Sequence, residues 1–252
     1  MIIVAGIHGD EYQPVRILEK NKIPFVLGNP RAYQMKKRFV EQDLNGCFGT
    51  KNENYESVRM RELLKKIPKN EMVIDFHTFS ATSEPFVVIV DSPPVSPSAR
   101  RGGRSEAGIT LLGLAKTTGI KRVVYMKHNI KKGHALINYR NGISVELGHH
   151  DSKMIEKRLI KVLKSITKGK PHKINLYEVY GKIPASPKPK RGEKEKDDYI
   201  NFKSNGEFIP ILAGEKAYNF GGLKAREKRD IIKGRNEKET RKHSVIVDLV
   251  FS

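Results

Sequence analysis

Three side chains that can bind a metal ion follow short apolar segments of the sequence. His8 and Glu11 lie in "VAGIHGDEYQP", where an apolar run ends in a glycine-rich bend, and His77 follows the apolar run "VIDF". Ligands of an open α/β sheet bind beyond the carboxyl ends of its strands, so we expect these side chains to meet there. Two histidines and a glutamate, with a fourth position left to water, form a catalytic zinc site. The sequence therefore predicts one zinc ion per chain, although His8 alone would also fit a hydrogen-bonded structural histidine.

Two acidic residues occupy similar positions. Glu146 lies in the apolar segment "GISVELG", where an acidic group is costly unless it belongs to a site. The role that fits Glu146 is that of a general base, which takes a proton from the zinc-bound water. The alternative for Glu146 is an ion pair with a nearby lysine. Asp75 lies two residues before His77, hence on the same side of the strand, and is expected to orient its imidazole.

The segments that must position these side chains alternate between strand and helix patterns. Short Val- and Ile-rich runs predict strands, and apolar residues at helical spacing predict helices. Such alternation is typical of an α/β domain with helices on both faces of its sheet. The expected strands are 1–7, 23–30, 71–78, 85–91, 121–127, 133–142 and 143–147, and the expected helices are 12–20, 55–67, 109–119 and 153–169.

The character of the chain changes near residues 169–171. Beyond them lie short apolar pieces with turns and charged stretches between, so we expect two units: a hydrolase domain over 1–169 and a small, mostly β unit over 170–252. The Pro/Ser/Arg-rich segment 92–106 is expected to be a mobile loop. The charged segment 224–243 is expected to be a solvated surface, and the sequence leaves open whether it is ordered.

Composition narrows the class of protein. The chain has 252 residues, 38% of them hydrophobic, which is enough for one sizeable core. Cys47 is the single cysteine, so no internal disulfide can form, and we expect it to be a buried small residue in a reducing compartment. No secretory leader pattern is visible at the start, and the longest apolar run is too short to cross a bilayer. The expectation is a cytoplasmic protein.

The net charge of +20 raises the question of a polyanionic partner. The basic residues are distributed along the whole chain and form no single concentrated arm. A lysine-rich proteome or a thermophilic host explains such a balance equally well. Nucleic acid is therefore not the expected main partner, because charge alone is a non-specific signal.

Four motifs together resemble a known family. The segments "GIHGDE", "NPRAY" with "RFVEQDLNGCF", "DFHT" and "GISVELG" follow one another in the order found in the succinylglutamate desuccinylase/aspartoacylase family of zinc carboxypeptidase-like amidohydrolases. The resemblance covers residues 1–165 and continues more loosely into 208–218. Four ordered motifs are far more specific than one. The resemblance implies a mixed sheet with helices on both faces.

The resemblance also implies roles for individual residues. The two histidines and Glu11 would bind zinc, and Glu146 would activate the water. Arg38 would polarise the scissile carbonyl and stabilise the oxyanion. Asn45 and Tyr218 would bind the substrate, a small N-acyl amino acid or related amide that is hydrolysed to an amine and a carboxylic acid. A solvated basic face for Arg38, and a core position for Tyr218, remain alternatives.

One position departs from the family pattern. The family usually has D-L-N-R, whose arginine binds a substrate carboxylate, whereas this chain has "DLNG" with Gly46 at that position. A glycine offers no charge and no fork of donors. Either Arg140, Lys37 or Arg31 supplies the charge instead, or the substrate lacks that carboxylate. The zinc chemistry is unaffected by this change.

Two other functions are compatible with the same residues. The first is a metallocarboxypeptidase that acts on peptides. The second is a polyanion-binding protein built on an inactive hydrolase scaffold, which the net charge supports and the complete catalytic set opposes. His149 and His150 closely follow Glu146, and we interpret them as residues at the rim of the site, because the ligand set is already complete.

Overall fold

Short runs rich in Val and Ile form most of the strands, and segments with apolar residues at helical spacing form the helices. The structure is a computed structural model that describes residues 1–90, 106–127, 134–185, 199–217 and 219–228. The strands are β1 (Ile2–Ala5), β2 (Val26–Leu27), β3 (Val73–Phe79), β4 (Phe86–Val90), β5 (Arg122–Met126), β6 (Gly142–His149), β7 (Asn175–Ile183), β8 (Ile209–Ile211) and β9 (Gly222–Lys228). The helices are α1 (Tyr12–Lys20), α2 (Pro30–Met35), α3 (Leu44–Cys47), α4 (Tyr55–Lys66), α5 (Glu106–Thr117), α6 (Leu136–Tyr139) and α7 (Ile155–Lys168).

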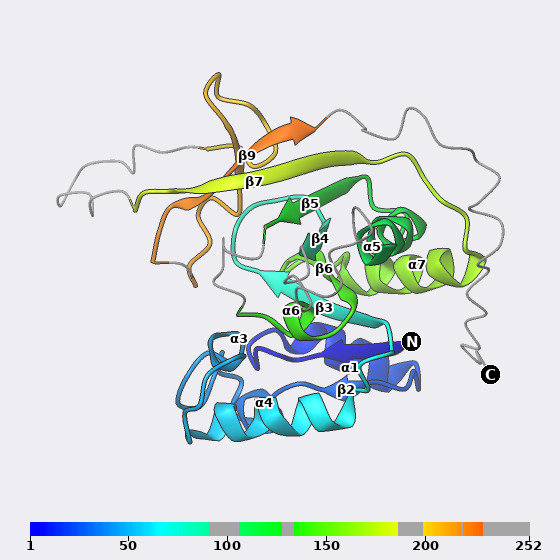
Figure 1. Ribbon diagram of the computed structural model, residues 1–252, viewed down its shortest axis with the longest axis vertical. Coiled ribbons are helices and arrows are strands. Elements are labelled where there is room, and N and C mark those ends of the chain that lie inside the picture. Colours follow the sequence, from blue (N-terminus) through cyan, green and yellow to red (C-terminus); the bar gives the residue numbers. More distant parts are fainter. Residues whose placement is uncertain (91–105, 128–133, 186–198, 218, 229–252) are drawn as a thin grey trace.

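The strands of the described residues form one mixed sheet in the order β2-β1-β3-β6-β4-β5-β7-β9-β8. The first four run parallel to one another, and the direction reverses at the antiparallel pair of β6 and β4. Strands β4, β5 and β7 are then parallel again, and β9 and β8 follow as antiparallel neighbours. Figure 1 shows β7 and β9 at one end of the molecule and α4 at the other.

Helices cover both faces of this sheet, which confirms the predicted α/β class with a mixed sheet. Helices α1, α5 and α7 pack on one face, over the inward side chains of β1, β3, β4, β5 and β6. Helices α3, α4 and α6 pack on the other face, over β1 and β3. The β4, β5 and β7 part of that second face carries a separate apolar cluster with residues of β8 and β9. Successive side chains of a strand point to opposite faces, so each of β3 to β6 contributes to both sides.

Two sequence predictions of secondary structure need correction. Residues 133–142 were expected to form a strand, but the described part forms the short helix α6, and its adjacent Leu136 and Ile137 are buried in different apolar clusters. The charged segment 224–243 was expected to be a solvated surface, but residues 224–228 belong to β9. There, Leu223 and Ala225 are fully buried while Arg226 pairs with Glu178.

The residues after 170 that the structure describes extend the same sheet through β7, β8 and β9. The division into two units at residue 169 stays a prediction. The expected loop 92–106, most of the segment 224–243 and the apolar piece at 243–251 lie outside the described residues. Among the helices in the described ranges, none combines the length and the apolar content needed to cross a membrane.

Candidate metal centre and its pocket

A tight bend after β1 places the first metal-binding candidates. Gly6 has a positive φ of 72°, which favours glycine, and the chain then turns toward α1. Gly9 packs directly against backbone, because a Cβ atom there would lie 2.1 Å from the carbonyl carbon of Ala32. The Gly9 amide donates to the Arg38 carbonyl at 3.2 Å. The glycines thus fix the path of the chain that carries His8 and bring it beside Arg38.

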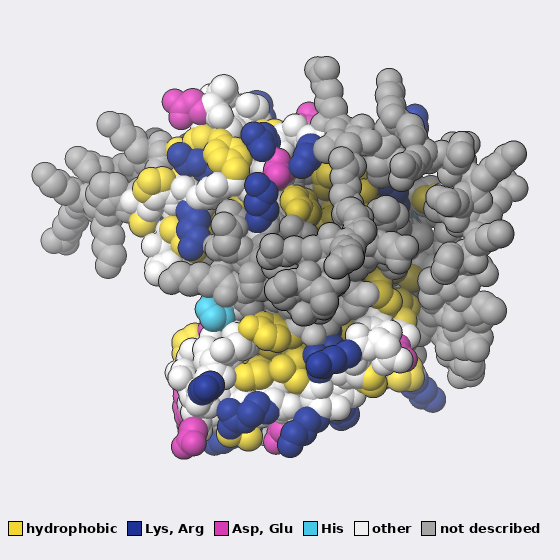
Figure 2. All heavy atoms as spheres, viewed as in Figure 1, with side chains coloured by type: hydrophobic (Ala, Val, Ile, Leu, Met, Phe, Trp, Pro, Cys, Tyr) yellow, Lys and Arg dark blue, Asp and Glu magenta, His cyan; other side chains and the backbone are white. Residues whose placement is uncertain are grey.

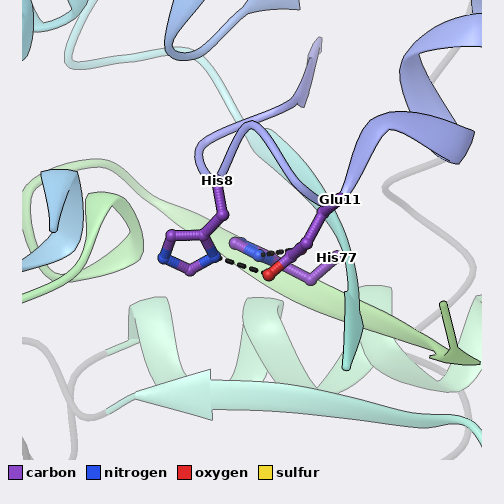
Figure 3. A group of neighbouring side chains, drawn as sticks. All are labelled: His8, Glu11 and His77. Atoms are coloured by element: carbon purple, nitrogen blue, oxygen red, sulfur yellow. Dashed lines mark hydrogen bonds and ion pairs between the residues drawn. The ribbon is translucent and has the colours of Figure 1, made fainter. Parts of the chain in front are cut away.

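Glu11 stands between the two histidines (Figure 3). It occupies the N-cap position of α1 but makes no capping hydrogen bond with its side chain. Its Oε1 lies 2.6 Å from Nδ1 of His8, and its Oε2 lies 3.0 Å from Nδ1 of His77. All three residues are buried, and one ligand atom from each lies within 4.8 Å of the others. The group could hold a metal ion, and the sequence prediction that these three side chains meet is confirmed.

Each histidine also faces an aspartate through its other ring nitrogen. Nε2 of His77 lies 2.8 Å from Oδ2 of Asp75, as the sequence predicted. Nε2 of His8 lies 3.3 Å from Oδ1 of Asp43, a contact that the sequence reasoning missed. A neutral histidine that ligates through Nδ1 carries its proton on Nε2 and can donate it to such a carboxylate, which fixes the tautomer and the ring orientation. Asp75 therefore orients the His77 ring with Nδ1 toward Glu11. Nε2 of His8 faces both Asp43 and Nη2 of Arg38, which lies 3.0 Å away and can only donate, so Asp43 alone does not define the tautomer of His8.

The charges of these buried groups depend on one another. Burial alone would lower the pKa of His77, but the Asp75 and Glu11 carboxylates outweigh it and hold that pKa well above its ordinary value. Burial likewise opposes charge on His8, yet Glu11 and Asp43 raise its pKa above the ordinary value. Burial would raise the pKa of Glu11, and the two imidazoles instead hold it well below its usual range. The site thus concentrates negative charge around nitrogen ligands, as a divalent cation requires.

Arg38 and Asn45 border the same group. The Arg38 guanidinium donates from Nε to Oδ2 of Asp43 at 3.0 Å, and its Nη1 lies 3.6 Å from Oε1 of Glu11. Asn45 is held by its backbone amide, which donates to Oδ1 of Asp43 at 2.9 Å. Oδ1 of Asn45 is buried and accepts no hydrogen bond from the described residues. Asp43 therefore holds the Arg38 guanidinium and the Asn45 backbone, while Oδ1 of Asn45 stays available to a ligand.

Glu146 lies beside the histidines because of strand register. On neighbouring strands β3 and β6, His77 and Glu146 are directly paired, so both side chains project from the same face of the sheet. Glu146 and the three metal-binding candidates line one pocket of about 630 Å³. Arg38, Asn45 and Gly46 line it as well. The structure thus brings together the six of these residues to which the sequence assigned a role.

The other residues proposed for substrate binding lie elsewhere. Arg140 is buried, and its guanidinium donates to the Ile67 carbonyl at 2.6 Å and to the Leu64 carbonyl at the end of α4. It does not line the pocket, because the carbonyl groups that end α4 take up its donors, so its predicted role is not supported. Lys37 and Arg31 are exposed and do not line the pocket either.

Tyr218 lies outside the described residues, although Ala217 and Asn219 on either side of it line the pocket. The C-terminal part of the chain also contributes Glu215, which the sequence analysis did not single out. Its carboxylate accepts from the Ser80 amide at 2.9 Å and from the Ser80 hydroxyl at 2.8 Å. These bonds join the segment before β9 to the chain that follows β3, so both parts form one pocket.

His134 lines the pocket, which the sequence analysis did not predict, and its Nδ1 lies 2.8 Å from the Phe48 carbonyl oxygen. His149 and His150 do not line the pocket, and Nδ1 of His150 lies 2.8 Å from the Thr78 hydroxyl. Cys47 is fully buried. Figure 2 shows the described Lys and Arg side chains of one face scattered among hydrophobic and acidic ones, without a single basic patch.

The sequence and the fold match proteins of known families. Residues 1–168 match the model of the family described as "Succinylglutamate desuccinylase/Aspartoacylase catalytic domain". A probable aspartoacylase of Prochlorococcus marinus (strain MIT 9515) is 27% identical over 64% of this chain and 59% of its own length. A succinylglutamate desuccinylase of Pseudomonas putida (strain KT2440) is 31% identical over 31% of this chain and 30% of its own length. The matches thus span less than two thirds of these relatives.

Solved structures share the fold over most of the chain. Murine aminoacylase 3 has a TM-score of 0.65 at 17% identity, over 90% of this chain and 95% of that one. Succinylglutamate desuccinylase from Vibrio cholerae has a TM-score of 0.64 at 20% identity, over 91% of this chain and 83% of that one. These likenesses establish a shared zinc carboxypeptidase-like fold.

Proposed function

Because this chain belongs to the succinylglutamate desuccinylase/aspartoacylase family, we propose that it is a zinc-dependent amidohydrolase. Its substrate is a small N-acyl amino acid or a related amide, which water cleaves into a carboxylic acid and an amine. The observation that carries the proposal is the arrangement of Glu11 between two Nδ1 atoms, each ring having an aspartate at Nε2. A histidine that ligates a metal usually has a carboxylate, carbonyl or water at its other ring nitrogen, as His77 has Asp75.

The donor set fits a zinc ion. His8, Glu11 and His77 would hold it with two nitrogens and one carboxylate, a set that leaves a position open to water or substrate. When bound, zinc lowers the pKa of water and polarises a carbonyl group. Asp75 keeps the His77 imidazole in the tautomer that this role needs, and Asp43 lies 3.3 Å from Nε2 of His8.

The other pocket residues have roles that follow from their chemistry. Glu146 accepts the proton of the attacking water on its carboxylate and passes it to the nitrogen of the leaving amine. The Arg38 guanidinium, held in place by Asp43, donates to the carbonyl oxygen as negative charge develops there. The unpaired Oδ1 of Asn45 accepts the N–H of the substrate amide. The Arg38 guanidinium is thus held before the substrate arrives, so it requires little reorganisation.

Metal content and hydrolysis test the proposal together. The purified chain, reconstituted with zinc and dialysed, should retain about one zinc per chain by mass spectrometry. His77→Ala should lose it, whereas His172→Ala should not, because His172 is exposed and its side chain bonds only to Ser165 among the described residues. Glu146→Gln should retain zinc and lose at least about 100-fold in kcat.

The same experiment can refute each part. Absence of zinc from the wild type after reconstitution would overturn the metal assignment. Full activity of Glu146→Gln would overturn its role as the base. A panel of N-acyl amino acids and short peptides separates a deacylase from a carboxypeptidase, and cleavage of the peptides alone would replace the proposed reaction by peptide hydrolysis.

A further inference from the structure

The pocket has two chemically different sides. One side carries the groups that act on the amide, and the other is a continuous apolar surface. Six apolar side chains line the second side of the pocket: Val88 and Val90 of β4, Met126 of β5, Ile137 of α6, Leu212 and Phe220. All six belong to the apolar cluster that covers this part of the sheet. A substrate that reaches the metal site therefore extends over an apolar wall.

Strand register explains where the change occurs. On this face, Asp75 of β3 is paired with Ser144 of β6, and Ser144 is paired with Val88 of β4. Val88 and Val90 are paired in turn with Val124 and Met126 of β5. From β3 to β5 the side chains on one face thus change from carboxylate to hydroxyl to purely apolar. The boundary coincides with the reversal of strand direction between β6 and β4.

The cationic groups of the described pocket already have partners. The Arg38 guanidinium is bound to Asp43. Nζ of Lys127 lies 4.0 Å from a carboxylate oxygen of Glu178, and Nζ of Lys182 lies 4.8 Å from the centre of the Phe220 ring.

Carboxylates are well represented in the same lining: Glu11, Asp43, Glu146 and Glu215. An acidic group placed on the apolar side of the pocket would lose its hydration there, which is costly without a charged partner. Binding of an apolar group to the apolar side of the pocket is favourable, because burial removes the group from water.

Gly46 lines the pocket and contributes no side chain to it. It lies in α3 with no positive φ, and a Cβ atom built on it meets only Nε2 of Gln42, at an ordinary 3.6 Å. The space beside the substrate is thus open at this position, and a larger side chain can enter it without backbone strain.

From these observations we propose that the preferred substrate carries an aliphatic or aromatic group, and no acidic group, where it lies on the β4–β5 wall. This inference rests on the proposed amidohydrolase function and deepens it. The apolar group belongs either to the acyl chain or to the amino acid side chain. Both sources present the same chemistry to Val88, Val90 and Met126.

Two substrate series distinguish the sources and test the proposal. The zinc-loaded chain is assayed with N-acetyl derivatives of leucine, phenylalanine, aspartate and glutamate, and with leucine carrying acyl chains of two to six carbons. We expect kcat/KM for the better apolar compounds to exceed that for the acidic ones at least about tenfold. It should rise about fourfold per methylene in the series whose variable part lies on the wall.

Position 46 provides the matched variants. Gly46→Arg should shift the ratio of acidic to apolar kcat/KM toward the acidic substrate by at least about tenfold, whereas Gly46→Ala should leave that ratio within about twofold. Equal shifts in the two variants would overturn the assignment of this position to charge selection.

These assays test the apolar substrate class and the amidohydrolase activity separately. Preference of the wild type for N-acetylaspartate or N-acetylglutamate would overturn the apolar substrate and leave the amidohydrolase intact. Failure of a zinc-loaded chain to hydrolyse any member of either series would overturn the proposed function, and the substrate class with it.

Discussion

Glu56 of α4 holds the loop that borders the metal site, although it does not touch the pocket. Its side chain is fully buried and accepts three successive backbone amides, from Val40 at 2.6 Å, Glu41 at 3.1 Å and Gln42 at 3.2 Å. Nδ2 of Asn29 donates a fourth hydrogen bond at 3.2 Å. Both carboxylate oxygens are needed, because each accepts two of the four donors.

Glu56→Gln keeps the shape of the side chain but replaces one of its two acceptor oxygens. One oxygen becomes an NH2 group that faces two donors, so two hydrogen bonds to a charged group are lost. Each such bond contributes about 1.5–3 kcal/mol, so we expect a loss of about 3–6 kcal/mol in the free energy of unfolding. Because the loop carries Arg38 and Asp43, kcat should also fall even though none of the reacting groups is altered.

Urea denaturation measures the stability change from the transition midpoint at constant slope. Glu62→Gln is the matched control, since Glu62 lies on the same helix, is half exposed and pairs only with Arg59 among the described residues. It should change stability by no more than about 0.5 kcal/mol. A Glu56→Gln protein within about 1 kcal/mol of the wild type would refute the claim that this carboxylate organises the loop.

Three further outcomes follow from the electrostatics. Asp75→Asn should weaken zinc retention about 10- to 100-fold in competition with a chromophoric chelator, because Nε2 of His77 loses its carboxylate. The raised pKa values of His8 and His77 mean that protons occupy the empty site above pH 6.5, so zinc affinity in the same titration should keep rising with pH through neutrality. The hydrogen bond from Arg226 lowers the pKa of Glu178, so its contribution to stability is complete above its ordinary pKa of 4.5 and is lost as the pH falls below it. Glu178→Gln should remove that part of the acid dependence of the urea midpoint.

The sequence predicted the ligand group because strand ends are visible in a single chain. The runs before His8 and His77 are apolar and bounded, and parallel neighbours place such ends at one edge. The 12–20 helix was predicted with the bounds of α1 for a similar reason, since its apolar spacing is regular. The local sequence pattern was sufficient to place a residue wherever a single strand or helix determines its position.

Contacts between distant segments were not visible in the same way. Asp43 reaches His8 because Glu56 holds the intervening loop, and nothing in the local pattern of "EQDLN" announces that contact. Arg140 was proposed only as a substitute for the charge missing at Gly46. It directly follows α6, where its backbone amide bonds to the Leu136 carbonyl and its side chain turns to the end of α4.

The reversal of strand direction between β6 and β4 separates the side chains proposed to act on the amide from those proposed to bind the apolar part of the substrate. Strands β1, β3 and β6 are parallel. His77 and Glu146 are paired within β3 and β6, in the carboxyl-terminal half of each strand, and His8 follows the end of β1 on the same side. Strands β4 and β5 run the other way, and the pocket meets inward side chains along their length, which packing makes apolar. Substitutions on the β4–β5 wall can therefore change what is bound while the groups that act on the amide keep their positions.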